Sequence, residues 1–181
     1  MESINKNKKI IFYLITIIIF IVLKFAYSYA NLVDLKFILY PTDKIVSLIT
    51  NSSSQYISEV GFFHEKYNFI IEKSCSGFNF WALCFIMLSF LSIKHLNSKL
   101  NQAIAILFVL FISFFLTIFV NSSRIIVSIV VQNQASYYMS NNPHTVIHEI
   151  IGIIINLSFL ILIYFLAEYF LNKIKHNEKL T

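Results

Sequence analysis

Long runs of apolar residues are the feature that most restricts how this chain can fold. A helix needs about 20 mostly apolar residues to cross the hydrocarbon of a bilayer, and the sequence has four runs close to that length. They cover residues 10–30, 75–93, 100–121 and 146–170. Only 13% of the residues are charged, against about 25% in a soluble domain. We therefore predict an all-α polytopic membrane protein, a single integral membrane domain over residues 1–181 with about four full transmembrane helices.

The lysines indicate how these helices are oriented. They gather before the first run, in the short loop between the second and third runs, and after the last run. Short segments rich in lysine and arginine stay in the cytoplasm, so both termini are predicted to be cytoplasmic in a multi-pass protein of the plasma or inner membrane. The net charge of +5 is clustered in this way and forms no continuous basic groove, so nucleic acid is not predicted as a partner.

The first run has a second interpretation. A signal peptide that is cleaved after Ser28-Tyr29-Ala30 is the alternative to a retained helix over residues 10–30. Cleavage at that point would leave the orientation of the later helices unchanged.

Residues 31–74 separate the first two runs and are predicted to be extracytoplasmic. The stretch "LKFILYPTDKIVSLIT" has the pattern of an amphipathic helix that lies along the membrane interface. Near residues 59–73 the pattern changes to two short extended runs with a turn near Glu65-Lys66. A small extended extracytoplasmic segment is therefore expected directly before the second span.

The stretch after Arg124 decides the number of crossings. Seven residues, "IIVSIVV", separate Arg124 from the polar Gln132-Asn133-Gln134, and they are too few to cross a bilayer. A full crossing here would also put the basic C-terminal tail outside, against the charge rule. We therefore predict a half-helix or an interfacial helix near residues 124–140, and expect Cys75, Arg124 and His148 at one depth on the outer face.

Cys75 stands between two serines in "EKSCSGFNFW". Ser74 or Ser76 is a natural N-cap, which places Cys75 in the first turn of the second helix. Unpaired amides and the helix dipole favour a thiolate there, and the thiolate is the nucleophilic form. Gly77 allows close approach of a substrate to the backbone. The alternative for Cys75 is a small buried residue, which is the role predicted for Cys84, about 13 Å deeper on the opposite face.

Arg124 is the only arginine among 14 basic residues. Its guanidinium is a planar donor that stays charged in poorly hydrated surroundings, so it is suited to hold an oxyanion. The alternative role is an interfacial anchor that reaches the lipid phosphates.

His148 follows "NNPHTVI", where Asn142 is a plausible N-cap and Pro143 a plausible first helical residue. His144 lies one turn before His148 and closer to water. A histidine protonates a leaving group and then activates an acceptor in general acid–base catalysis. The alternative is a metal site of His144, His148 and one carboxylate, although Glu149 points elsewhere around the helix.

Taken together, the motifs resemble the exosortase/archaeosortase family of polytopic membrane proteins. The matching residues are Glu72 with Cys75-Ser76-Gly77, then Asn121 with Arg124, then His148 with Gly152. The resemblance covers about half of the chain, from Val60 to Gly152. The chain has fewer predicted spans than many members, so it looks like a short member close to the exosortase K type.

The resemblance implies protein sorting by transpeptidation, without cofactor or metal. The substrate would be an exported protein with a short C-terminal motif, a membrane helix and a basic tail, and the acceptor a group at the cell surface. Cys75 would be the nucleophile, Arg124 would hold the oxyanion and His148 would be the acid and base. Glu72, Ser76, Gly77, Asn121 and Gly152 would support them. Glu72 has three possible roles, which are to orient Arg124, to pair with Lys73, or to be solvated.

Other classes remain as alternatives. A thiol oxidoreductase would need a second cysteine within reach, typically Cys-x-x-Cys, and the spacing of Cys75 and Cys84 argues against it. A non-catalytic transporter or scaffold subunit would tolerate the loss of Cys75. An intramembrane metallopeptidase would use the histidine pair instead.

Overall fold

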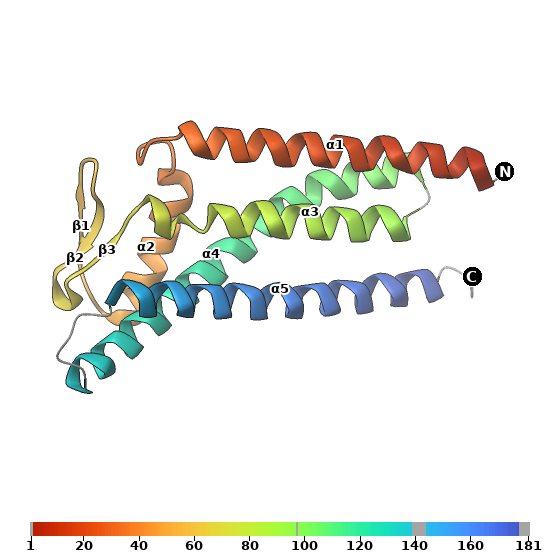
Figure 1. Ribbon diagram of the computed structural model, residues 1–181. Coiled ribbons are helices and arrows are strands. Elements are labelled where there is room, and N and C mark those ends of the chain that lie inside the picture. Colours follow the sequence, from red (N-terminus) through yellow and green to blue (C-terminus); the bar gives the residue numbers. More distant parts are fainter. Residues whose placement is uncertain (1, 97, 139–143, 178–181) are drawn as a thin grey trace. The chain divides into compact units, whose positions relative to one another are not determined.

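The computed structural model describes residues 2–96, 98–138 and 144–177, with side chains for 9–96, 98, 100–131 and 150–174. This part of the chain is mostly helical and contains one small sheet (Figure 1). The helices are α1 (Glu2–Tyr29), α2 (Lys36–Thr50), α3 (Phe78–His95), α4 (Lys99–Tyr138) and α5 (His144–Asn177). The strands are β1 (Ser54–Ile57), β2 (Gly61–His64) and β3 (Phe69–Ile71).

Four helical stretches are long and apolar enough to cross a membrane, counted over the described residues. They are Lys9–Tyr29, Lys73–His95, Leu100–Val131 and Ile150–Ile174. Large apolar side chains such as Phe111 and Phe115 in α4 are mostly exposed, which lipid tolerates and water does not. The four predicted apolar helices are confirmed, and they indicate a polytopic membrane protein.

The chain folds into two compact units, and the first consists of residues 1–28, 79–116 and 160–181. Trp81 donates from Nε1 to the Leu110 carbonyl and packs edge-on against Phe114, so α3 and the first part of α4 are joined. At one end of this unit the Lys9 ammonium donates to the Lys94 carbonyl, and His95 lies 3.1 Å from the Asn172 amide oxygen. The start of α1, the end of α3 and the last turns of α5 therefore share one end of the unit.

The second unit consists of residues 29–78 and 117–159, and α2 supplies much of its core. Leu35 and the α2 residues Ile38, Leu39 and Val46 are buried, as is Ile71 of β3. The spacing of these positions is that of an amphipathic helix, so the predicted helix in this stretch is confirmed.

The sheet is antiparallel with the order β1-β2-β3. A 3₁₀ turn over Glu65–Tyr67 joins β2 to β3, which confirms two extended runs with a turn near Glu65-Lys66. Gly61 has a φ of 127°, and a Cβ there would collide with the Ile71 carbonyl, so β3 approaches β2 closely only because of this glycine. Strand β1 was not predicted, since "SQYI" is short and mostly polar.

Helix α4 corrects one prediction. The sequence was expected to end a span near residue 121 and to form a separate half-helix or interfacial helix near 124–140, but one helix of 40 residues runs from Lys99 to Tyr138. It contains no glycine or proline, and the hydroxyls of Ser122 and Ser123 donate to the carbonyls four residues earlier. Polar residues are thus accommodated without a break. At about 60 Å, α4 is longer than the hydrocarbon of a bilayer, about 30 Å thick.

Candidate functional site

Cys75 lies in a 3₁₀ turn, Lys73–Ser76, between β3 and α3. The prediction that it occupies the first turn of the long helix is wrong, because α3 begins only at Phe78. The Cys75 amide donates to the Glu72 carbonyl at 3.0 Å, and the Ser76 hydroxyl accepts from the Phe78 amide at 3.3 Å. Of the two serines expected to cap the helix, only Ser76 contacts the first amide of α3, and it does so from the residue before Gly77. Both cysteines are buried and free.

Gly77 joins the Cys75 turn to α3 in a left-handed conformation, with a φ of 72°. A Cβ at this position would lie 2.9 Å from Asn121 Cγ and 3.1 Å from Thr117 Cγ2. Glycine is required because it tolerates positive φ and lets α4 pack closely. Close packing of α4 is thus a reason for glycine that was not expected, and close approach of a substrate at Gly77 stays a prediction.

Asn121 connects its own motif, which it shares with Arg124, directly to the motif around Cys75. Its side-chain amide Nδ2 donates to the Cys75 carbonyl at 2.5 Å, across 46 residues of sequence. Asn121 is 2% exposed and Cys75 is 4% exposed, so the bond is shielded from solvent. The position of the Cys75 main chain is therefore tied to α4.

Arg124 connects the same motif to the one that contains His148 and Gly152. A Cβ on Gly152 would lie 3.4 Å from both Cδ and Nε of Arg124, so the arginine side chain lies against the α5 backbone at a residue without a side chain. His148 precedes Gly152 by one turn of α5, about 6 Å along the axis. The side chains of His144, His148 and Glu149 and the predicted cap at Asn142-Pro143 fall outside the described residues.

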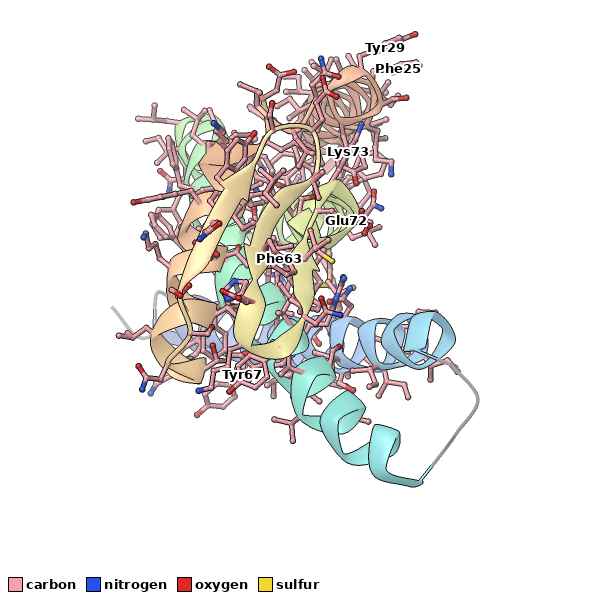
Figure 2. All side chains as sticks on the ribbon, turned by 90° about the vertical axis from the view of Figure 1, so that its left-hand side faces the viewer. Phe25, Tyr29, Phe63, Tyr67, Glu72 and Lys73 are labelled. Atoms are coloured by element: carbon pink, nitrogen blue, oxygen red, sulfur yellow. The ribbon has the colours of Figure 1, made fainter. Side chains whose placement is uncertain are left out.

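Glu72 and Ser74 form a polar chain that ends at the cysteine. Ser74 Oγ donates to Glu72 Oε1 at 2.6 Å and lies 3.8 Å from Cys75 Sγ. Figure 2 shows Glu72 and Lys73 on the segment that follows the sheet. No ion pair joins Glu72 to Arg124 within the described part of the chain. The sequence predicted Ser74 only as a possible helix cap. Its hydrogen bond to the Glu72 carboxylate depends on the 3₁₀ turn at Lys73–Ser76, which was not predicted.

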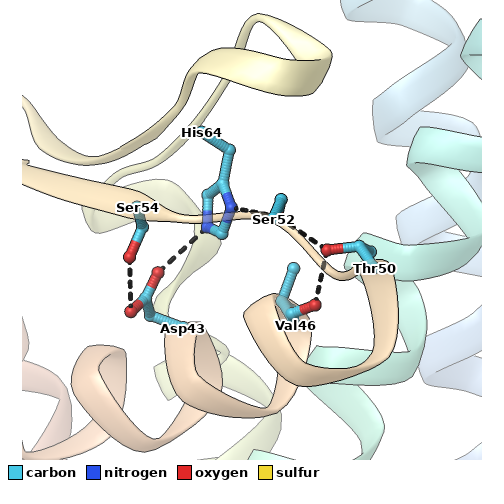
Figure 3. Close-up of polar contacts among 6 residues, drawn as sticks. All are labelled: Asp43, Val46, Thr50, Ser52, Ser54 and His64. Atoms are coloured by element: carbon cyan, nitrogen blue, oxygen red, sulfur yellow. Dashed lines mark hydrogen bonds and ion pairs between the residues drawn. The ribbon is translucent and has the colours of Figure 1, made fainter.

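A second polar cluster was not predicted. His64 Nε2 lies 2.9 Å from Asp43 Oδ1, and His64 Nδ1 lies 2.8 Å from Ser52 Oγ (Figure 3). Ser54 donates to the other Asp43 oxygen at 2.9 Å, and Thr50 contacts Ser52 at 2.7 Å. These side chains are buried or partly buried and are mutually satisfied, so the cluster fastens β1 and β2 to α2. The only sequence signal was an aspartate on the apolar face of α2.

Described residues from each of the three motifs lie in the second unit. Cys75, Asn121, Arg124 and Gly152 all belong to the second unit, and successive contacts link them. Among the described residues, no group of three or more His, Cys, Asp or Glu side chains could hold a metal ion. Comparison with protein-family models, with curated proteins and with solved structures gave no match.

Proposed function

We propose that the chain is a membrane-embedded cysteine transpeptidase or protease of the exosortase/archaeosortase kind. Its substrates would be exported proteins with a C-terminal motif, a membrane helix and a basic tail. The observation that carries the proposal is the hydrogen bond from Asn121 to the Cys75 carbonyl. With the packing of Arg124 on Gly152, it supports a common site for three motifs that the sequence keeps far apart.

The proposed reaction has two steps. The Cys75 thiolate attacks a peptide carbonyl carbon, and the Arg124 guanidinium stabilises the negative oxygen of the tetrahedral intermediate. His148 protonates the departing amine, which leaves a thioester on Cys75. His148 then takes a proton from the acceptor nucleophile, which attacks the thioester and releases the Cys75 thiolate with the product. A surface acceptor gives transfer, and water gives hydrolysis.

The charges support an orientation for this reaction. Lys9, Lys94 and the last turns of α5 lie at one end of the first unit, and a basic end is typical of the cytoplasmic face. Both termini would then be cytoplasmic, and residues 31–74 would be extracytoplasmic. Cys75 precedes the end of α3 opposite Lys94, so it would act at the outer face, next to the membrane helix of its substrate.

Two cysteine variants test the proposal. The chain is co-produced with an exported protein that carries a short C-terminal motif, a membrane helix and a basic tail, chosen by a search of its genomic neighbours. The mass of that protein then reports removal of the tail. Cys75→Ala should abolish processing, whereas Cys84→Ala should leave it intact. Normal processing by Cys75→Ala would refute the enzyme proposal and favour a scaffold or transporter role.

A further inference from the structure

Three buried polar atoms on α4 have no hydrogen-bond partner among the described residues. They are Asn121 Oδ1, Arg124 Nε and Ser128 Oγ. Positions three and seven residues apart lie on one side of a helix, so the atoms form a row on α4. Buried polar groups are nearly always hydrogen-bonded, because an unpaired one lowers stability. The row therefore points to a partner from outside the described chain.

The orientation of the Asn121 amide restricts the chemistry of that partner. Nδ2 donates to the Cys75 carbonyl, and a flipped amide would bring two oxygens together. Asn121 Oδ1 is thus held as an unpaired acceptor, whereas Arg124 Nε is always a donor. A phosphate or carboxylate anion offers acceptors only and would leave Asn121 Oδ1 unpaired. A peptide group offers one N–H donor and one carbonyl acceptor.

We propose that this row binds the main chain of a peptide. The peptide N–H donates to Asn121 Oδ1, and a peptide carbonyl accepts from Arg124 Nε. Ser128 lies about 10 Å from Asn121 along the helix axis, the length of about three residues of extended chain. The terminal nitrogens of Arg124 remain available for an oxyanion.

This inference deepens the proposed function, because it names an extended peptide as the ligand beside Cys75. Main-chain contacts of this kind are insensitive to side chains. The α4 row then fixes the position of the peptide along the site and contributes to its affinity. The choice of one sorting motif over another comes from contacts with the peptide side chains elsewhere.

A thiol-reactive peptide tests the proposal without any turnover. The full-length Cys84→Ala protein in detergent micelles has Cys75 as its single thiol. It is treated with iodoacetyl-Ala-Ala-Ala-amide and with two analogues, each with one internal amide N–H replaced by an ester oxygen. All three reagents share the same reactive head, so rate differences report on the replaced N–H.

The amide peptide should alkylate Cys75 about tenfold faster than at least one ester analogue, the effect of one buried hydrogen bond. Asn121→Ala should bring that ratio to about one, even if it lowers all rates. Ser123→Ala, on the same turn of α4, should keep the ratio. The ratio is the readout, so a partly disturbed Cys75 turn does not obscure it.

Three results would overturn the proposal. Equal rates for all reagents would mean that the row binds only water, an unchanged ratio in Asn121→Ala would place the contact elsewhere, and an unreactive Cys75 would mean that no peptide reaches it. The assay requires no sorting substrate. A clear amide preference with normal processing by Cys75→Ala would therefore reject the proposed function and keep the peptide-binding row.

Discussion

The side-chain amide of Asn121 donates a 2.5 Å hydrogen bond to the main-chain carbonyl of Cys75. A buried contact thus joins two residues that are 46 positions apart. It involves neither the Cys75 thiol nor a charged group. The contact orients the turn that carries the thiol, and it also decides which way the asparagine oxygen faces.

Asn121→Ala should lower the free energy of unfolding by about 1–3 kcal/mol, because the buried Cys75 carbonyl loses its partner. Asn121→Asp should cost more, since it places a carboxylate oxygen against that carbonyl. Thermal unfolding of purified protein in detergent micelles measures both. Ser123→Ala is the matched control on the same turn and should stay within about 0.5 kcal/mol of the parent. If the aspartate variant were as stable as the parent, the hydrogen bond would be misassigned.

Gly77→Ala should be destabilising, by more than about 1 kcal/mol, for two reasons that act together. The residue has a φ of 72°, and its new methyl group would lie 2.9 Å from Asn121 Cγ. Gly152→Ala is the comparison, because its methyl group would meet Arg124 at an ordinary 3.4 Å within a helix that favours alanine. The same unfolding measurement should therefore separate the two variants, and equal melting temperatures would contradict the left-handed turn.

The buried pair of Asp43 and His64 should show energetic coupling. Asp43→Ala and His64→Ala each leave polar partners unsatisfied, so each should cost about 1–3 kcal/mol, and the double variant should cost less than their sum by about 0.5–3 kcal/mol. Lys44→Ala changes the exposed neighbour and serves as the control. Unfolding of the parent, the two single variants and the double variant gives the coupling energy. Strict additivity would show that the 2.9 Å contact adds nothing to stability.

Local pattern was sufficient for the four apolar helices and for the turn near Glu65-Lys66, but not for the full length of α4 or for the turn at Cys75. The apolar runs predicted four long helices because lipid imposes their length and composition. The extent of α4 was missed since Ser122 and Ser123 bond within their own helix, which composition does not reveal. The turn at Cys75 depends on Gly77 being left-handed, and the pairing of Asp43 with His64 depends on how β2 meets α2. Both are tertiary effects that a one-dimensional pattern does not contain.

Arg124→Lys should preserve the fold and lose most of the proposed activity. Lysine keeps the charge but replaces the planar guanidinium, whose Nε lies over Gly152, with a flexible ammonium. Loss of one oxyanion donor typically lowers kcat by about 10²–10³, so tail removal from the exported substrate should slow by that order, with an unchanged melting temperature. Gly152→Leu should produce a similar loss by displacing the guanidinium, and Gly152→Ala should remain active. Full activity of both Arg124→Lys and Gly152→Leu would exclude Arg124 from the chemistry and leave it as an interfacial anchor.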